Sequence, residues 1–417
     1  MTLLSRRAWL AALGMAAAPS SAGCADVLAP EDEPVPSTAH PDGWPVSNYD
    51  VANTRHVPHD GPTDDVQRRW RFEHDDIIGD DLPLIAIADG TAYIGTSEAE
   101  IHAIDTGDGE GELLIDLDSS DERTLEAPIL GITIFEDHLY VVSDGLYAIS
   151  RDDGAEEWHV WVVEEEAHLP GIDGPALPVG DHVYVGGFGV YAIDRELGEV
   201  AWHFETDDLP PTFGAHDGNL GPFVIETPAV GEGTVYATTF DPILYAIDAD
   251  TGEERWRYET EDAGFGTPVI RDDIVLLPVH DRLLAFDAER GDEEWSVTFD
   301  DAIISPIAVT DEAVFLFRGD ALLSYEIGTG DERANVDLEP HGIDRSVTRI
   351  RPVVTDEVIY TLGRFGEHLF AFSTVDHELL WDHEIEVDKR FGVGSIVLEG
   401  SVLHHMRAGS LSAYADH

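Results

Sequence analysis

Cationic side chains are scarce in this chain of 417 residues, which has 23 Lys and Arg residues against 85 Asp and Glu residues. Their positions are informative, because guanidinium and ammonium groups bind carboxylates and other anions. We predict that nine of them form a basic half-face that binds a carboxylate ligand, an acidic surface glycan or an acidic segment of another protein. The alternative is that each pairs with a neighbouring acid and holds the structure together. The nine lie in or beside loops that we expect on one half of one face: Arg282, Arg318, Arg345, Arg349, Arg351, Arg364, Lys389, Arg390 and Arg407.

A long insertion, residues 207–222, is a second candidate site, since long loops often carry function. We expect it to cross the same face as the basic residues. It offers polar and aromatic side chains at Phe213, His216, Asp217 and Asn219. These side chains either line a pocket or cap the centre of the fold in a structural role.

Other reactive side chains do not form a recognisable site. His404 and His405 are adjacent in an expected strand, so they point to opposite faces and cannot readily share one ion. The acidic run at 105–112 lacks the ligand spacing of a calcium loop. The sequence contains no Gly-rich phosphate loop, nucleophile elbow or zinc motif. We therefore predict no catalytic, metal-binding or cofactor-binding residues.

The elements that must position these residues come from a repeat. In residues 223–260, short runs of Val, Ile, Tyr and Thr alternate with Gly and Asp turns, which predicts four strands. The most regular part reads Ala-x-Asp-x-x-x-Gly-x-x-x-Trp. Intervals of 39 to 54 residues between copies are typical of propeller blades, which bury their faces only by packing around an axis. With the third motif position as anchor, eight copies lie at 105, 150, 194, 248, 287, 326, 373 and 415.

The motif has a physical reason at each position. Asp at the strand end accepts hydrogen bonds from the turn, Gly supplies a positive φ, and Trp offers a large flat face to the next blade. Weaker copies carry Leu113 and Ala334 in place of the tryptophan. We expect six tryptophans to dock blades on one another: Trp70, Trp158, Trp202, Trp256, Trp295 and Trp381.

The eighth copy, residues 391–417, ends shortly after its anchor and lacks the tryptophan strand. The sequence WRF at 70–72 stands before the first copy and resembles WHF at 202–204. We predict that this amino-terminal strand completes the last blade, which closes the ring and removes exposed sheet edges. The predicted fold is all-β, an eight-bladed β-propeller of four-stranded antiparallel blades over residues 66–417.

The formal net charge of −62 is spread along the whole chain between the expected strands. Molar salt screens the resulting self-repulsion, so the composition is that of a protein from an extreme halophile. It argues against nucleic acid as a partner, since binding a polyanion needs clustered basic residues. Because like charge also resists association, we expect a monomer.

The first residues predict export. Residues 1–23 contain a twin arginine followed by a short apolar run, which is typical of a twin-arginine signal peptide. The segment ends in SAGC, a lipobox-like sequence in which the single cysteine, Cys24, carries a lipid. Simple cleavage after a small residue is the alternative. Residues 24–43 are rich in Pro and acid, and we expect a tether that holds the protein at the outer side of the cytoplasmic membrane.

The repeat over residues 66–417 resembles that of the quinoprotein-type, or PQQ-like, β-propeller family. Residues 44–55, WPVSNYDVANTR, resemble the leader that precedes such repeats, and we assign 44–65 to it. The resemblance implies one of two roles. Quinoprotein dehydrogenases hold pyrroloquinoline quinone (PQQ) and Ca²⁺ over the axis, commonly beside two adjacent cysteines. Other members are scaffolds, such as the lipoprotein of the outer-membrane β-barrel assembly machinery.

With one cysteine, the chain has neither adjacent cysteines nor a haem-attachment motif, and no residue pair matches the dehydrogenases' catalytic Asp and calcium-binding Glu and Asn. We therefore predict a non-catalytic scaffold at the cell surface without a cofactor, whose partner is an unidentified surface protein or anionic ligand. The alternative is a PQQ-dependent dehydrogenase of alcohols or sugars, with PQQ and Ca²⁺ as cofactors.

Overall fold

The computed structural model describes most of the chain from Gly43 onward, and these residues are largely β-strand. Where the structure is described, no helix has both the length and the apolar character needed to cross a bilayer. The predicted signal peptide, Cys24 and nearly all of the tether lie outside the described residues. The described residues are 43–77, 84–117, 128–160, 172–187, 189–206, 224, 227–239, 243–259, 266–300, 306–341, 343, 351–363, 366–385 and 394–416.

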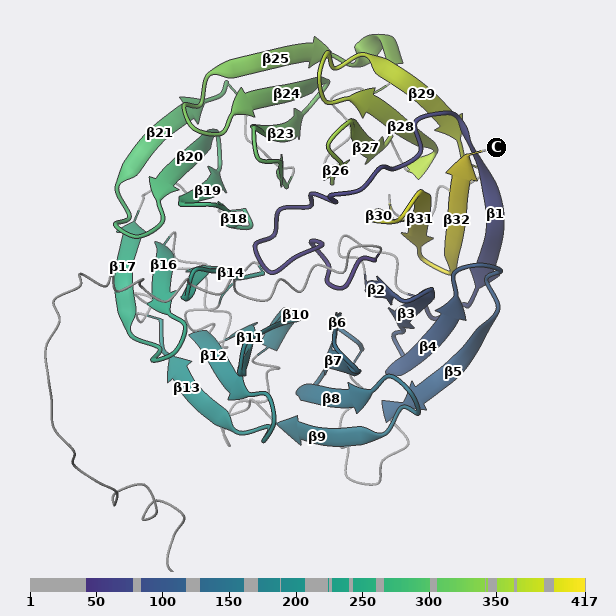
Figure 1. Cartoon of the computed structure of the whole chain (residues 1–417), viewed down its shortest axis with the longest axis vertical. Helices are drawn as coiled ribbons and strands as arrows, with labels where there is room; N and C mark the ends of the chain where they lie inside the picture. The colour runs from purple at the N-terminus through teal and green to yellow at the C-terminus, as the bar shows by residue number, and fades with distance from the viewer. Residues whose placement is uncertain are drawn as a thin grey trace, which may run out of the picture. The chain divides into compact units, whose positions relative to one another are not determined.

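Eight four-stranded antiparallel sheets surround a common axis, which confirms the predicted propeller (Figure 1). In seven blades the strands follow chain order from the axis to the rim. Blades 1 and 2 comprise β2 (Ile85–Ala88), β3 (Thr91–Gly95), β4 (Glu100–Asp105), β5 (Gly111–Asp116), β6 (Gly131–Phe135), β7 (His138–Val142), β8 (Leu146–Ser150) and β9 (Glu156–Val160). Blades 3 and 4 comprise β10 (Ile172–Val179), β11 (His182–Gly187), β12 (Gly189–Asp194), β13 (Val200–Phe204), β14 (Ala229–Gly231), β15 (Thr234–Thr238), β16 (Ile243–Asp248) and β17 (Glu254–Glu259).

The second half of the ring repeats this pattern. Blades 5 and 6 comprise β18 (Val269–Arg271), β19 (Ile274–Val279), β20 (Arg282–Asp287), β21 (Glu293–Thr298), β22 (Ala308–Val309), β23 (Ala313–Arg318), β24 (Ala321–Glu326) and β25 (Glu332–Asp337), followed by a 3-10 turn, η3 (Glu339–His341). Blade 7 comprises β26 (Val353–Val354), β27 (Val358–Leu362), β28 (His368–Ser373) and β29 (Leu379–Glu384).

The two ends of the described chain build blade 8 together. Its strands are β30 (Ser395–Glu399), β31 (Val402–Arg407), β32 (Ser410–Asp416) and, at the rim, β1 (Val66–Glu73). β1 pairs antiparallel with β32 from Val66 opposite Asp416 to Glu73 opposite Ser410. The prediction that the amino-terminal strand closes the ring is therefore confirmed.

Strand position explains strand composition. Inner strands such as β2, with the sequence IAIA, are buried on both faces, so they are apolar throughout. Outer strands such as β17, with the sequence ERWRYE, alternate exposed and half-buried side chains. Charged residues along this outer edge discourage pairing with strands of other molecules.

The predicted docking tryptophans lie on outer strands, and five of them contact the hairpin turn of the next blade. The indole Nε1 of Trp256 donates to the Ala288 carbonyl at 2.9 Å. Its ring lies so close to Gly291 that an added Cβ would stand 2.6 Å from the indole Cδ2. Trp70, Trp158, Trp202 and Trp295 donate in the same way to the carbonyls of Thr106, Arg195, Ala249 and Ile327.

Three blade interfaces depart from this arrangement. Blade 1 has no tryptophan on β5, and Leu114 contacts the next turn instead, since a Cβ on Gly154 would stand 2.6 Å from the Leu114 carbonyl oxygen. Blade 8 has no outer hairpin, and Trp381 instead donates to the carbonyl of Pro62 at 3.2 Å. Blade 6 carries the small Ala334 where a tryptophan is expected, and the next turn carries His377 where the others have glycine. His377 is 5% exposed and lies 2.9 Å from the Ser324 hydroxyl. A large side chain on the turn thus replaces the large side chain on the strand.

This packing predicts different effects for two glycine substitutions. Gly291 (φ +72°) and Gly400 (φ +51°) share a left-handed backbone, but only Gly291 faces an indole, since a Cβ on Gly400 meets nothing within 4 Å. In both alanine variants, backbone strain should lower the free energy of unfolding by about 1–2 kcal/mol. Gly291→Ala should lose about 1–3 kcal/mol more, because Trp256 has to move. Urea unfolding in molar KCl measures both, and equal losses would contradict the tight docking.

Candidate functional site at the propeller axis

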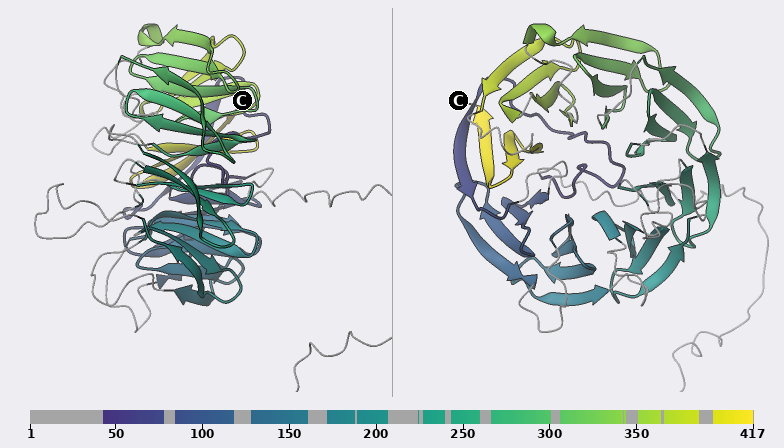
Figure 2. Two further views of the ribbon diagram at one scale, coloured as in Figure 1. Left: turned by 90° about the vertical axis from the view of Figure 1, so that its left-hand side faces the viewer. Right: turned by 180° about the vertical axis from the view of Figure 1, so that it is seen from behind.

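The leader crosses the centre of the ring. The purple segment in Figure 1, residues 43–62, runs between the inner strands of opposite blades, and the view from behind in Figure 2 shows it at the same place. The sequence predicts this segment only as a leader before the repeats and gives it no structural role. Its position makes it the central element of the described site.

Backbone hydrogen bonds join the leader to the inner strands of six blades. In each case the strand's N–H donates to a leader carbonyl, at 2.7 to 3.0 Å. The donors occupy one equivalent position, the residue whose partner lies five residues later across the first hairpin of the blade. The pairs are Ile87 to Trp44, Ile134 to Pro45, Val230 to Val51, Ile270 to Ala52, Val309 to Thr54 and Val354 to Arg55.

Blade 3 has no such bond for a covalent reason. Its equivalent residue is Pro178, which pairs with Val183 and has no N–H to donate. The leader thus satisfies inner-strand donors that would otherwise lack partners at the axis.

Leader side chains bind the start of the inner strands. The Asn53 amide donates to the carbonyls of Thr227, Pro228 and Pro268 at 3.2, 2.9 and 3.0 Å. Its own carbonyl oxygen accepts from the Asn48 amide at 3.0 Å. One buried side chain therefore joins the leader to blades 4 and 5.

Arg55 makes the matching contact with blade 7. Its Nε donates to the Pro352 carbonyl at 2.7 Å, and its Nη1 donates to Asn48 Oδ1 at 2.9 Å. The guanidinium carbon also lies 5.7 Å from the centre of the Trp44 ring, within cation–π range. Arg55 is 1% exposed, so its charge is carried into the interior.

The positive charge of Arg55 is incompletely compensated. Burial, and then the nearby Arg351, lower the pKa of Arg55 to about 9, which leaves the guanidinium protonated at neutral pH. Its Nη2 is buried, and no acceptor among the described residues lies within hydrogen-bond distance. A buried cation in this state favours the approach of an anion.

Asp50 takes part in the leader's own fold. Its carboxylate accepts hydrogen bonds from the backbone N–H and the hydroxyl of Thr54, at 2.9 and 2.5 Å. Burial raises the pKa of Asp50 despite these bonds. The carboxylate therefore stabilises the turn between the leader's two halves.

Four of the nine residues of the predicted basic half-face lie in the described structure. Arg282 Nη2 lies 3.7 Å from Glu293 Oε1 of the same blade. Arg318 lies over the Phe299 ring, 5.5 Å from its centre, in a groove of about 350 Å³ between blades 5 and 6. Arg282 thus lies near an acid, as the structural alternative expects, whereas Arg318 contacts an aromatic ring.

Arg351 and Arg407 lie deeper. Arg351 directly precedes Pro352, the residue that Arg55 binds, and is half-buried near the axis. Arg407 ends β31 and is 4% exposed. The structure therefore brings Arg351 to Arg55, a neighbour that sequence reasoning missed. Outside the described residues lie Arg345, Arg349, Arg364, Lys389, Arg390, Phe213, His216, Asp217 and Asn219.

The axial hydrogen bonds predict that Asn53→Ala is strongly destabilising. The change removes the side-chain donor to three carbonyls and the acceptor of Asn48, and we expect a loss on the order of 3 kcal/mol. Asn335→Ala, on the exposed side of β25, is the matched control and should change stability by less than about 0.5 kcal/mol. Urea unfolding of the two variants in molar KCl compares them. Similar stabilities would mean that the leader contributes little to the ring.

Several solved structures share the fold at low sequence identity. A quinohemoprotein alcohol dehydrogenase from Comamonas testosteroni matches with a TM-score of 0.70 and 15% identity, covering 91% of this chain and 81% of that chain. A europium-containing methanol dehydrogenase matches with a TM-score of 0.69 and 13% identity, over 91% and 99% of the two chains. BamB from Moraxella catarrhalis matches with a TM-score of 0.58 and 16% identity, over 84% and 98%.

Comparison by sequence finds one family. None of the curated protein sequences matches the chain. The model of the family described as outer membrane protein assembly factor BamB matches residues 63–212 and 186–404. The two matches together span most of the blades that surround the leader, and the chain therefore belongs to the PQQ-like β-propeller family.

Proposed function

We propose that the protein is a non-catalytic binding scaffold, held at the cell surface by a lipid on Cys24, that recognises an anionic group of its partner at the axis. The observation that carries this proposal is the leader. Its polar side chains are used to hold the ring together, and they leave an incompletely compensated cation, Arg55, at the centre.

The described axial residues do not fit the Ca²⁺ ion of the dehydrogenase branch. Ca²⁺ needs several carboxylate, amide or carbonyl oxygens that are free to converge on it. The side-chain oxygens of Asn48, Asp50 and Asn53 accept hydrogen bonds from Arg55, Thr54 and Asn48 within the leader. These residues therefore support the scaffold over the enzyme.

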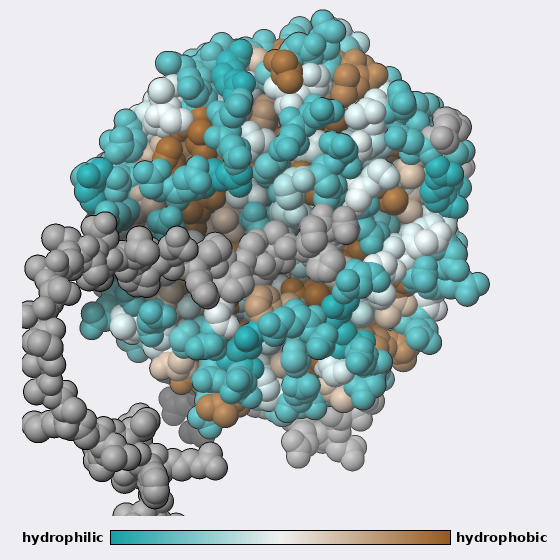
Figure 3. Space-filling model, in the orientation of Figure 1, coloured by the Kyte–Doolittle hydropathy of each residue, from teal (hydrophilic) through white to brown (hydrophobic). Residues whose placement is uncertain are grey.

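We expect this protein to recognise a partner by charge, because its surface offers little apolar area. The face in Figure 3 is mostly hydrophilic, and its brown apolar areas are small and separate. Large exposed apolar side chains among the described residues are scattered over blades 1, 3 and 7: Leu113, Leu197, Val200, Val375 and Leu380. Arg55 and Arg351 together suit the carboxylate of an acidic segment or ligand.

The test is cross-linking of the tagged full-length protein on host membranes in molar KCl, followed by quantitative mass spectrometry. We expect one partner protein, cross-linked in an amount nearly equal to that of the tagged protein. The Arg351→Gln variant should lose this partner, because its axial positive charge is reduced. Arg333→Gln is the control, since Arg333 lies on outer strand β25 and should keep the partner.

Two results would overturn parts of this proposal. A partner that both variants retain would support a scaffold that does not use the axial charge. Stoichiometric binding of PQQ with Ca²⁺, together with dye reduction by alcohols or sugars, would favour the dehydrogenase. The same preparation serves the titration with PQQ and Ca²⁺.

The membrane anchor is tested separately. Cys24→Ser removes the lipid acceptor, and we expect the exported protein to move from the membrane fraction to the medium, because a lipid chain supplies the membrane affinity. Immunoblots of the two fractions measure this. An unchanged membrane fraction would contradict lipid anchoring at Cys24.

A further inference from the structure

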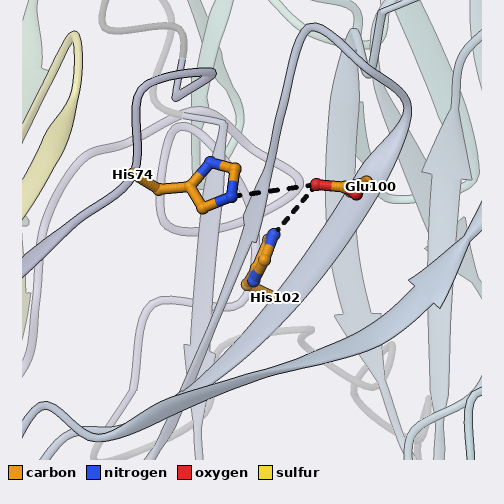
Figure 4. A group of neighbouring side chains, drawn as sticks. All are labelled: His74, Glu100 and His102. Carbon is orange, nitrogen blue, oxygen red and sulfur yellow. Dashed lines mark hydrogen bonds and ion pairs between the residues drawn. The ribbon is translucent and has the colours of Figure 1, made fainter.

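The side chains of His74, Glu100 and His102 lie close together between blade 8 and blade 1 (Figure 4). His74 follows β1, the closing strand, whereas Glu100 and His102 lie two residues apart on β4. Residues two apart on a strand point to the same face. The strand therefore presents a carboxylate and an imidazole together, and the loop after β1 adds a second imidazole.

Both imidazoles point toward the same carboxylate oxygen (Figure 4). His102 Nε2 lies 3.2 Å and His74 Nε2 lies 3.9 Å from Glu100 Oε2. The two ring centres are 4.5 Å apart. One ligand atom from each side chain lies within 4.8 Å of the others. Ligand atoms of a tetrahedral zinc ion, with bonds of about 2.0–2.1 Å, stand about 3.3 Å apart, so a small movement of His74 brings the three to coordination distance.

The backbone around the three residues is already fixed. The His74 N–H donates to the Gly409 carbonyl in blade 8, and Ser97 N–H donates to the Asp76 carbonyl from blade 1. The Glu100 N–H donates to the Thr96 hydroxyl at 3.1 Å. Both ends of the cluster are therefore held before any ion arrives, which lowers the entropic cost of binding.

One polar atom of the cluster lacks a partner. His74 Nδ1 is buried, and no described residue lies within hydrogen-bond distance of it. The nearest carboxylate is Asp76 Oδ2, at 3.9 Å. Histidine ligands of metal ions commonly donate their other ring N–H to a carboxylate, which fixes the tautomer. The same small movement that brings Nε2 to an ion allows Nδ1–H to reach Asp76.

We propose that His74, Glu100 and His102 bind one divalent transition-metal ion of the zinc type. Two imidazoles and one carboxylate suit Zn²⁺ and its neighbours, whereas Ca²⁺ and Mg²⁺ prefer oxygen ligands alone. Half-burial of His74 and Glu100 leaves the fourth coordination position accessible to water or to a group of a partner.

The ion links the two blades at which the ring closes. His74 extends from the rim strand of blade 8, and the other two ligands belong to blade 1. An ion that binds only the closed ring stabilises it by mass action. Metal binding should therefore raise the unfolding temperature as well as show a fixed stoichiometry.

The test uses the full chain, treated with chelator and kept in molar KCl so that weak binding to the many surface acids is screened. Co²⁺ is titrated by its visible absorption and then displaced by Zn²⁺. We expect one ion per chain, with affinity at least about 100-fold lower in His74→Ala and Glu100→Gln. His138→Ala is the control, because His138 lies outside the cluster and contacts a single carboxylate, Glu157 Oε2 at 2.9 Å. The metal affinity of this variant should equal that of the unchanged protein.

Two measurements keep the proposal falsifiable if a variant fails to fold. X-ray absorption of the unchanged protein with Zn²⁺ should show two imidazole nitrogens and a carboxylate oxygen at about 2.0–2.2 Å. Zn²⁺ should raise the melting temperature of the unchanged protein and of His138→Ala alike. An all-oxygen shell, or equally weak binding in all four proteins, would reduce the cluster to a hydrogen-bonded contact between blades.

Discussion

The unpaired inner edge of each blade is the constraint on which the rest of the structure depends. A sheet that ends at the axis leaves peptide groups that need partners, and water or protein must supply them. Here the leader supplies six carbonyls to one equivalent N–H of six blades, and Pro178 removes the donor in a seventh. Because the strands surround the leader in a ring, the six carbonyls from Trp44 to Arg55 reach the six blades in chain order. The leader backbone is therefore irregular, while apolar side chains such as Trp44 and Val51 pack in the core.

Contacts between blades follow a rule of matched size. A tryptophan on one outer strand requires glycine on the next turn, as Trp256 and Gly291 show. Where Ala334 replaces the tryptophan, His377 fills the space from the other side. At the closure, where no hairpin exists, Pro62 of the leader receives hydrogen bonds from both Trp381 and Tyr360. The same segment thus satisfies the axis and completes the last interface.

Sequence predicted the features that local patterns encode. Blade number and closure followed from the repeat and from the tryptophan strand missing after the anchor at 415. The axial role of Asn53 did not, because its partners Thr227 and Pro268 are more than 170 residues away and carry no motif. The pair Glu100 and His102 was visible as a two-residue spacing, but nothing in the sequence joins it to His74. Contacts made by a ring closing on itself cannot be read from neighbouring residues.

If the protein works in molar salt, as its composition predicts, its charge explains why directed, buried contacts matter. In molar salt the Debye length is about 3 Å, so most surface ion pairs are screened and contribute little. Repulsion among the surface acids, which give the formal charge of −62, then destabilises the fold little, and surface ion pairs stabilise it little. Buried hydrogen bonds and matched shapes are not screened in this way. The side chains that do hold the ring at its centre and at its closure, Asn53, Arg55 and Trp381, are accordingly buried and bind backbone carbonyls, whose partial charges salt cannot reach.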